Sequence, residues 1–238
     1  MMRFEEIFNP WFVGSLIALL IWIVFFILAK KLRKEMIITS FVALPWGFTE
    51  YIFSKEYWSP PSLFDLNEKI GLDIETFIFT FAIGGLSAII YNYFTHKILV
   101  RIPENSSLKQ HGHKFGLFGA FSFIIILVGL YFATNIDLIY INFIACFVGA
   151  IIASLCRPDL KNKIWFGGLI FLLFYLFFML IFIFIYPDFI EQYYHLSSLS
   201  RIMIWKIPLE EALFAFSVGM LWSSMYEHLF WYRLRKSE

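Results

Sequence analysis

The sequence predicts an all-α polytopic membrane protein with seven transmembrane helices, arranged as two parallel three-helix repeats joined by one linking helix. Of its 238 residues, 60% are hydrophobic and 16% are charged, whereas soluble domains contain about 45–50% apolar and about 25% charged residues. The apolar residues form runs close to the ~20 residues that a spanning helix needs. The chain also matches itself at an offset of 135 residues, which indicates an internal duplication.

Seven apolar segments are predicted to cross the membrane. The second is the weakest, because it is short and contains Pro45, Gly47 and Glu50. The first has its basic residues after it and no Ala-x-Ala-like site, so we expect a first span and not a cleaved signal peptide. The predicted spans lie near residues 11–29, 36–53, 74–94, 115–133, 138–156, 164–186 and 208–230.

Basic residues predict the orientation in a cell inner (plasma) membrane. The segments 30–35, 95–114 and 157–163 and the tail from 231 hold 14 of the 19 Lys and Arg residues. Cytoplasmic loops carry an excess of Lys and Arg. We therefore expect the N-terminus outside the cell and the C-terminus in the cytoplasm.

The repeat explains the odd number of helices. Phe12-Val13-Gly14 falls on Phe147-Val148-Gly149, and Ile74-Glu75 falls on Leu209-Glu210. Helices one to three thus match helices five to seven, and helix four is the extra crossing that keeps both repeats parallel. The predicted units are a first repeat, a cytoplasmic loop with the linking helix, and a second repeat, at residues 1–94, 95–137 and 138–238.

Four glutamates are expected at one depth in the outer third of the membrane, with no Lys or Arg in the spans: Glu50, Glu75, Glu210 and Glu211. Such residues are costly in a bilayer, so they suggest function. Burial without a cation disfavours the charged form, so these groups can act as proton donors. The plainer interpretation is that they are helix-start acids, stabilised by ~0.3–1 kcal/mol. A fifth, Glu227, is expected to reach cytoplasmic water.

Aromatic side chains surround these acids along the sequence. Their rings can form an apolar substrate pocket and stabilise a carbocation by cation–π attraction. The candidate substrate-binding residues are Trp46, Trp58, Phe79, Phe81, Phe214 and Phe216.

Other classes of site have little support. A net charge of +1 argues against nucleic acid as a partner, and no nucleotide or flavin motif is present. Cys146 and Cys156 lack metal-type spacing. His96, His111 and His113 belong to a basic loop that we interpret as solvated. We therefore expect no metal and no cofactor.

The motifs resemble those of the membrane-integral lycopene (carotenoid) cyclase family, in its fused form with two heterodimeric-type repeats. Pro208-Leu209-Glu210-Glu211 is similar to the family's Pro-x-Glu-Glu segment, and Asp73-Ile74-Glu75-Thr76 is a degraded copy. Trp46-x-x-x-Glu50, followed by Tyr57-Trp58-Ser59-Pro60, resembles the family's Trp-Asp helix and Trp-x-x-Pro loop. Glu50 stands where the family has Asp.

The resemblance implies an intramolecular lyase or isomerase that cyclises the end group of a linear, lycopene-type polyene without a cofactor or redox change. It implies acid and base roles for Glu210 and Glu211, with Glu75 as their first-repeat counterpart. Glu210 is the first choice for the proton donor. The substrate would be an apolar isoprenoid that enters from the bilayer. A homo-oligomer or carotenoid-pathway enzymes are possible partners.

Two alternatives stay open at this stage. A SWEET-like transporter shares the three-plus-one-plus-three plan, although the apolar spans favour an apolar ligand. The second alternative is a divergent isoprenoid-binding or isoprenoid-modifying membrane protein that does not cyclise. A CAAX-type protease would need Arg at position 215, which is Ala, and a rhodopsin would need a Lys inside the last helix.

Overall fold

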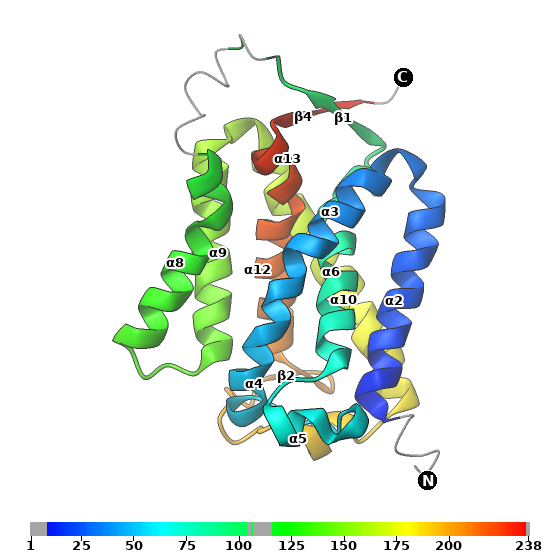
Figure 1. Cartoon of the computed structure of the whole chain (residues 1–238), viewed down its shortest axis with the longest axis vertical. Coiled ribbons are helices and arrows are strands. Elements are labelled where there is room, and N and C mark those ends of the chain that lie inside the picture. The colour runs from blue at the N-terminus through cyan, green and yellow to red at the C-terminus, as the bar shows by residue number, and fades with distance from the viewer. Residues whose placement is uncertain (1–8, 104–105, 107–115, 237–238) are drawn as a thin grey trace.

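The computed structural model describes residues 9–103, 106 and 116–236. These residues form a mostly helical protein with its long helices side by side (Figure 1). The predicted loop histidines His111 and His113 lie outside the described residues.

Six helical segments are long and apolar enough to cross a membrane. They correspond to the first six predicted spans and are Pro10–Leu28 (α2), Lys30–Ser54, Ile74–Phe94 (α6), Gly116–Ala133 (α8), Leu138–Cys156 (α9) and Pro158–Ile185. The last of these contains a 3-10 turn, Pro158–Leu160, and α10, Lys161–Ile185. The coarse class, a helical membrane protein, is therefore supported.

The second segment is irregular, as its sequence indicates. The 3-10 turn Lys30–Leu32 leads into α3, Arg33–Ala43. A second 3-10 turn, Leu44–Thr49, then leads into α4, Glu50–Glu56. Pro45 has no N–H to continue the α-helical ladder. This change of winding sets the direction in which Glu50 leaves the helix.

The C-terminal apolar run is also divided. Helix α12, Leu209–Ser223, has 15 residues and ends at Ser224, and α13, Met225–Phe230, follows it. Helices α2, α6, α9 and α12 run from the end that holds the N-terminus towards the other end, and α3, α8 and α10 run back (Figure 1).

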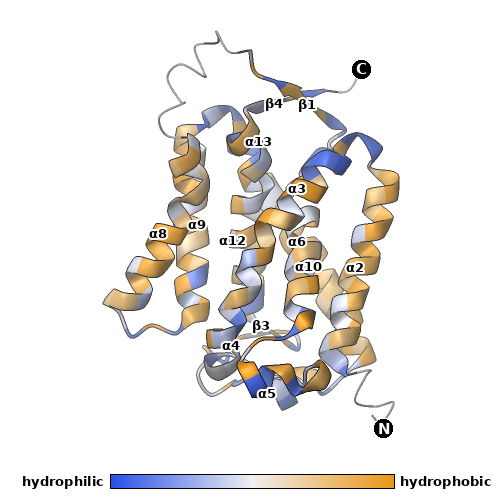
Figure 2. Cartoon of the chain, viewed as in Figure 1, coloured by the Kyte–Doolittle hydropathy of each residue, from blue (hydrophilic) through white to orange (hydrophobic). Residues whose placement is uncertain are grey.

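Short elements cover both ends of the helices. Near the N-terminal end lie the 3-10 turn Leu63–Asp65, α5 (Leu66–Ile70), α11 (Phe189–Tyr193) and the hairpin of β2 (Met203–Ile204) and β3 (Ile207–Pro208). At the opposite end β1 (Lys97–Arg101) pairs antiparallel with β4 (Tyr232–Lys236). Figure 2 shows hydrophilic residues gathered at the two ends, whereas the helices are mainly hydrophobic.

Helix α6 is the centre of the packing. In the α6 span 78% of the residues are buried, whereas in the α2 span 22% are buried. Leu20 and Ile27 of α2 are exposed. Helix α6 packs against α2, α3, α10 and α12. A Cβ atom on Gly84 would lie 2.3 Å from the Ala43 Cβ atom, so only glycine permits this approach of α6 to α3.

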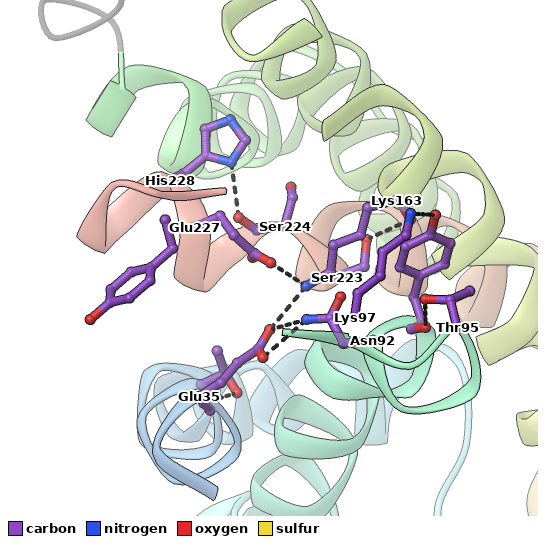
Figure 3. A network of polar contacts seen from close by, with 12 residues as sticks. Glu35, Asn92, Thr95, Lys97, Lys163, Ser223, Ser224, Glu227 and His228 are labelled. Atoms are coloured by element: carbon purple, nitrogen blue, oxygen red, sulfur yellow. Dashed lines mark hydrogen bonds and ion pairs between the residues drawn. The ribbon is translucent and has the colours of Figure 1, made fainter. Parts of the chain in front are cut away.

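A buried ionic cluster joins four helices at the end opposite the N-terminus (Figure 3). The Lys163 ammonium of α10 donates to Glu35 Oε1 of α3 at 2.9 Å and to Glu227 Oε1 of α13. Asn92 of α6 donates to both Glu35 oxygens, at 3.2 and 3.1 Å. The Lys163, Glu35 and Glu227 side chains are all 0% exposed.

This cluster corrects two expectations. Glu227 does not reach water, and Lys163 is a cation inside a spanning helix and not a loop residue. The break at Ser224 turns α13 so that Glu227 meets α10, and burial of these charges is tolerated because they pair with each other.

We predict that Lys163→Met lowers the free energy of unfolding by about 3–5 kcal/mol, because it leaves two buried carboxylates without a cation. Thermal or denaturant unfolding in detergent would measure this loss. The matched variant Glu227→Gln keeps the Lys163–Glu35 pair and should lower the free energy of unfolding by clearly less than Lys163→Met does. Equal losses in the two variants would contradict the assigned pairing.

Candidate active site

A cavity opens among the helices towards the N-terminal end of the bundle. It contains about 920 Å³ of space not filled by protein atoms, part of which is open. Its lining is mainly aromatic, with some aliphatic residues and a few polar groups, and it includes two carboxylic acids, Glu50 and Glu211. Further lining residues are Trp11, Trp46, Tyr57, Trp58, Thr76, Phe79, Thr80, Tyr175, Phe178, Tyr194, Phe214, Val218 and Trp222.

Helical periodicity explains which side chains face the cavity. On α12 the lining residues are Glu211, Phe214, Val218 and Trp222, which are three or four residues apart and so share one face. Glu210 points about 100° away from Glu211, because consecutive residues of an α-helix differ by that angle. The adjacent glutamates of the motif therefore have different surroundings.

Three tyrosine hydroxyls converge on Glu211. Tyr57 and Tyr194 donate to Oε1, each at 2.7 Å, and Tyr175 donates to Oε2 at 2.6 Å. Glu211 is 4% exposed. Burial and the nearby Glu211 raise the pKa of Tyr57 and Tyr194 well above the usual value, so both phenols stay protonated as donors. Three donors on two oxygens is the arrangement that stabilises an ionised carboxylate.

Backbone pairing fixes the two tyrosines that lie outside the long helices. The Ser59 N–H donates to Tyr193 O, and the His195 N–H donates to Tyr57 O. Trp58 and Tyr194 form a β-bridge between these segments. This pairing holds the residues after α4 and after α11 together, next to the first turn of α12.

Glu50 has weaker partners than Glu211. It is 2% exposed and accepts from the Trp58 indole N–H at 3.4 Å and from Asn67 Nδ2 at 3.3 Å. Among the residues that the structure describes, neither Glu50 nor Glu211 has an ion-pair partner. A buried carboxyl with few donors and no cation favours the neutral form.

Aromatic rings enclose the space between the two acids. The Trp11 and Trp58 rings meet edge to face at 4.4 Å between centroids, and Trp46 meets Trp222 at 5.2 Å. The ring centroids of Tyr175 and Phe214 lie 6.1 Å apart. Faces of tryptophan and phenylalanine carry negative charge density that attracts cations.

Four of the six aromatic candidates from the sequence line the cavity: Trp46, Trp58, Phe79 and Phe214. The Phe81 ring instead packs against Trp22, with 5.1 Å between ring centroids. The Phe216 ring lies near Phe147, with 6.4 Å between centroids. Two residues along a helix correspond to a rotation of about 200°. Phe81 and Phe216 therefore face away from Phe79 and Phe214.

Glu75 and Glu210 are buried but are absent from the cavity lining. Glu75 Oε1 accepts from Asn9 Nδ2 at 3.1 Å and from the Leu63 N–H at 2.7 Å. Glu210 Oε1 accepts from the Tyr140 hydroxyl at 2.7 Å and from the Ser200 N–H at 2.8 Å.

In both of these glutamates the Oε2 atom has no hydrogen-bond partner. Each glutamate thus fastens one connecting segment to the start of its own helix, α6 or α12.

Sequence reasoning missed the residues that give Glu211 its environment. Tyr57, Tyr175 and Tyr194 lie in three separate segments, and no spacing rule connects them. Only Tyr57 had a local signal, because it precedes Trp58 in the Tyr-Trp-Ser-Pro stretch.

We predict that Glu210→Met speeds amide hydrogen exchange at Ser200 by about tenfold or more, since a hydrogen bond to a charged group contributes ~1.5–3 kcal/mol. Glu75→Met should do the same at Leu63. Exchange followed by mass spectrometry on peptides that cover each segment would measure both rates.

The two variants are controls for each other, because each should leave the other segment unchanged. Equal acceleration of both segments in either variant would mean that global opening, and not a local fastening, was being measured.

Residues 137–229 match the family model described as lycopene cyclase. The matched part includes Tyr175, Tyr194 and the Glu210-Glu211 pair, and Glu50 lies outside it. Neither a curated protein nor a solved structure matches the chain. The predicted resemblance to a lycopene cyclase family is thereby confirmed over residues 137–229, whereas the fused two-repeat form stays a prediction.

Proposed function

We propose that this protein is an integral-membrane enzyme that cyclises a linear, lycopene-type polyene end group by acid catalysis. The match of residues 137–229 to the lycopene cyclase family model supports a carotenoid cyclase-like function. The carrying observation is one aromatic cavity with two carboxyl groups in contrasting surroundings. Glu211 accepts three phenol donors, and Glu50 has two long N–H contacts.

In this proposal Glu50 is the acid. Its carboxyl proton goes to the terminal double bond of the substrate, and a tertiary carbocation forms. The π electrons of a nearby double bond of the same chain then form the new carbon–carbon bond and close a six-membered ring. The cation moves to a ring carbon, while Glu50 is left as a carboxylate. Pairs of titratable groups with contrasting environments commonly divide acid and base roles in this way.

Glu211 is the counter-ion and base. Its carboxylate attracts the cation across the cavity and removes a proton from the ring carbon next to the charge, so that a ring double bond forms. One proton is donated and one is removed, and no electron leaves the substrate. The step thus needs neither a cofactor nor a redox partner. Glu50 regains its proton before the next turnover.

Aromatic faces supply the rest of the stabilisation. Trp58 lies beside Glu50, and Trp46, Phe79 and Phe214 line the same space. A desolvated cation over such rings gains about 2 kcal/mol or more per contact. The apolar lining also suits a polyene that enters laterally from the bilayer, and it keeps water away from the carbocation.

This assignment moves the role of donor from Glu210 to Glu50. Glu75 and Glu210 remain necessary in the proposal, but as residues that hold the segments around Leu63 and Ser200. Their loss should reduce activity through the shape of the cavity.

We also propose the complete architecture of seven spans in two parallel repeats. Helices α2, α3 and α6 would correspond to α9, α10 and α12, with α8 as the linking helix. The parallel course of α2, α6, α9 and α12 supports this plan (Figure 1). So do the matching contacts of Glu75 and Glu210, each of which accepts one backbone and one side-chain donor.

The cavity end of the bundle is assigned to the outer side of a cell inner membrane, because the basic residues of segments 30–35, 97–101, 157–163 and 231–236 lie at the other end. Reporter fusions after residues 72 and 102 test this orientation. Alkaline phosphatase should be active at 72 and GFP should fluoresce at 102. The reverse result would overturn the orientation without affecting the chemistry.

The enzyme assay is expression in a bacterial strain that accumulates lycopene, with pigments separated by chromatography. The expected product is γ- or β-carotene. Glu50→Gln and Glu211→Gln should each lower conversion by at least about 100-fold, because general acid–base groups contribute about 10²–10⁴-fold.

Glu75→Gln and Glu210→Gln are matched controls that should keep measurable conversion, since glutamine still offers an acceptor oxygen. Unchanged lycopene with a membrane-inserted wild-type protein would refute the proposed substrate. Full activity of Glu50→Gln would refute its role as the acid.

A further inference from the structure

A polar path leaves the cavity at Glu50 and leads to the start of α6. The side-chain amide of Asn67, on α5, donates to Glu50 Oε1 at 3.3 Å and to Asp73 Oδ2 at 3.4 Å. One Nδ2 group therefore touches two carboxyl groups. Asp73 is 2% exposed and lies outside the cavity lining.

The two carboxyl groups differ in how well they can carry a charge. Asp73 is the N-cap of α6 and accepts from the Thr76 N–H through Oδ1. Helix N-termini stabilise an anion through the dipole and the free N–H groups. Glu50 is not at a helix N-cap with a backbone donor of this kind. It accepts from Trp58 and Asn67 over longer distances and also interacts with the Thr76 side chain. The negative charge of this pair therefore belongs on Asp73 and the proton on Glu50.

The Asp73 carboxyl group faces Glu50 through Asn67. Burial raises the pKa of Asp73 to about 6, and the Thr76 N–H counteracts part of that rise. Two carboxyl groups that share a site do not readily ionise together.

Among the residues that the structure describes, no Lys or Arg forms an ion pair with Glu50 or Asp73. Glu75 is a further acid that acts on Asp73, and Trp11 and Thr76 contribute neutral donors. On the Glu50 side, the Tyr194 phenol is close enough to interact electrostatically with the Glu50 carboxyl group. Lys69, on the same short helix as Asn67, is exposed and lies 3.7 Å from the Asp65 carboxylate.

We propose that Asp73 is a positioning residue of the active site: its carboxylate, connected to Glu50 through Asn67, holds the catalytic proton on Glu50. The proposal rests on the proposed function for its catalytic meaning. Asp73 does not touch the substrate. It acts through the charge that it places beside Glu50.

The test is the pH profile of kcat/KM for Asp73→Asn in detergent or proteoliposomes. Asparagine caps helices as well as aspartate does, so the fold is retained and only the charge is lost. Glu50 should then ionise at lower pH, and the alkaline limb of the profile should move down by about one pH unit or more. Asp65→Asn removes an exposed charge from the same segment and should leave the limb in place.

A second readout does not depend on cyclase activity. Infrared difference spectroscopy follows the C=O stretch of a protonated carboxylic acid during a pH titration. The band of Glu50 is identified because it disappears in Glu50→Gln. In Asp73→Asn this band should vanish at lower pH than in the otherwise unchanged protein.

The outcomes separate the two proposals. If no polyene is cyclised but the infrared shift appears, the charge pairing stands and the proposed reaction fails. An unchanged infrared transition in Asp73→Asn overturns the role of Asp73, whatever its activity. An equal shift in Asp65→Asn also overturns it, because the effect would then be one of general charge.

Discussion

The site depends on the cost of placing a carboxyl group in a largely apolar interior without a cation. Three phenol hydroxyls compensate this cost for Glu211; they come from the residue after α4, from α10 and from the segment after α11. Each of those tyrosines is in turn held by packing or backbone pairing, as at the Trp58–Tyr194 bridge. The position of α12 relative to its neighbours is thus tied to the hydrogen bonds of one side chain.

The two ends of the molecule compensate the burial of carboxyl groups in different ways. At one end Lys163 compensates Glu35 and Glu227 with a full charge. At the cavity end Glu50 and Glu211 accept hydrogen bonds from neutral donors and have no ion-pair partner among the described residues. A cation beside Glu50 would favour its ionised form and remove the proton that the proposed reaction needs. The separation keeps the stabilising ion pairs away from the reactive carboxyl groups.

The sequence predicted the helical membrane class because long apolar runs have few other solutions. Of the residues that the sequence proposed for the site, Glu50, Glu211 and four aromatic residues line the cavity; their role in a reaction stays a prediction. The sequence could not rank Glu211 above Glu210, because neighbouring residues differ only in the direction that the helix gives them.

Other features depend on contacts between distant segments. The pairing of Lys163 with Glu35 and Glu227 was missed, since Lys163 follows a polar turn and looks like a loop residue. Asn67 stands in a segment with no motif, so its bridge between Glu50 and Asp73 appears only when α5 is folded back beside α4 and the start of α6. The tyrosine group around Glu211 was missed for the same reason.

The cavity draws on both halves of the chain. Glu50, Tyr57 and Phe79 come from residues before 95, and Tyr175 and Glu211 come from residues after 137. Neither half alone lines the cavity, and in the proposed reaction the acid comes from one half and the base from the other. A substitution that changes the shape of one side of the cavity therefore changes the space that the other side encloses. The two halves form one site, even if they arose as two copies.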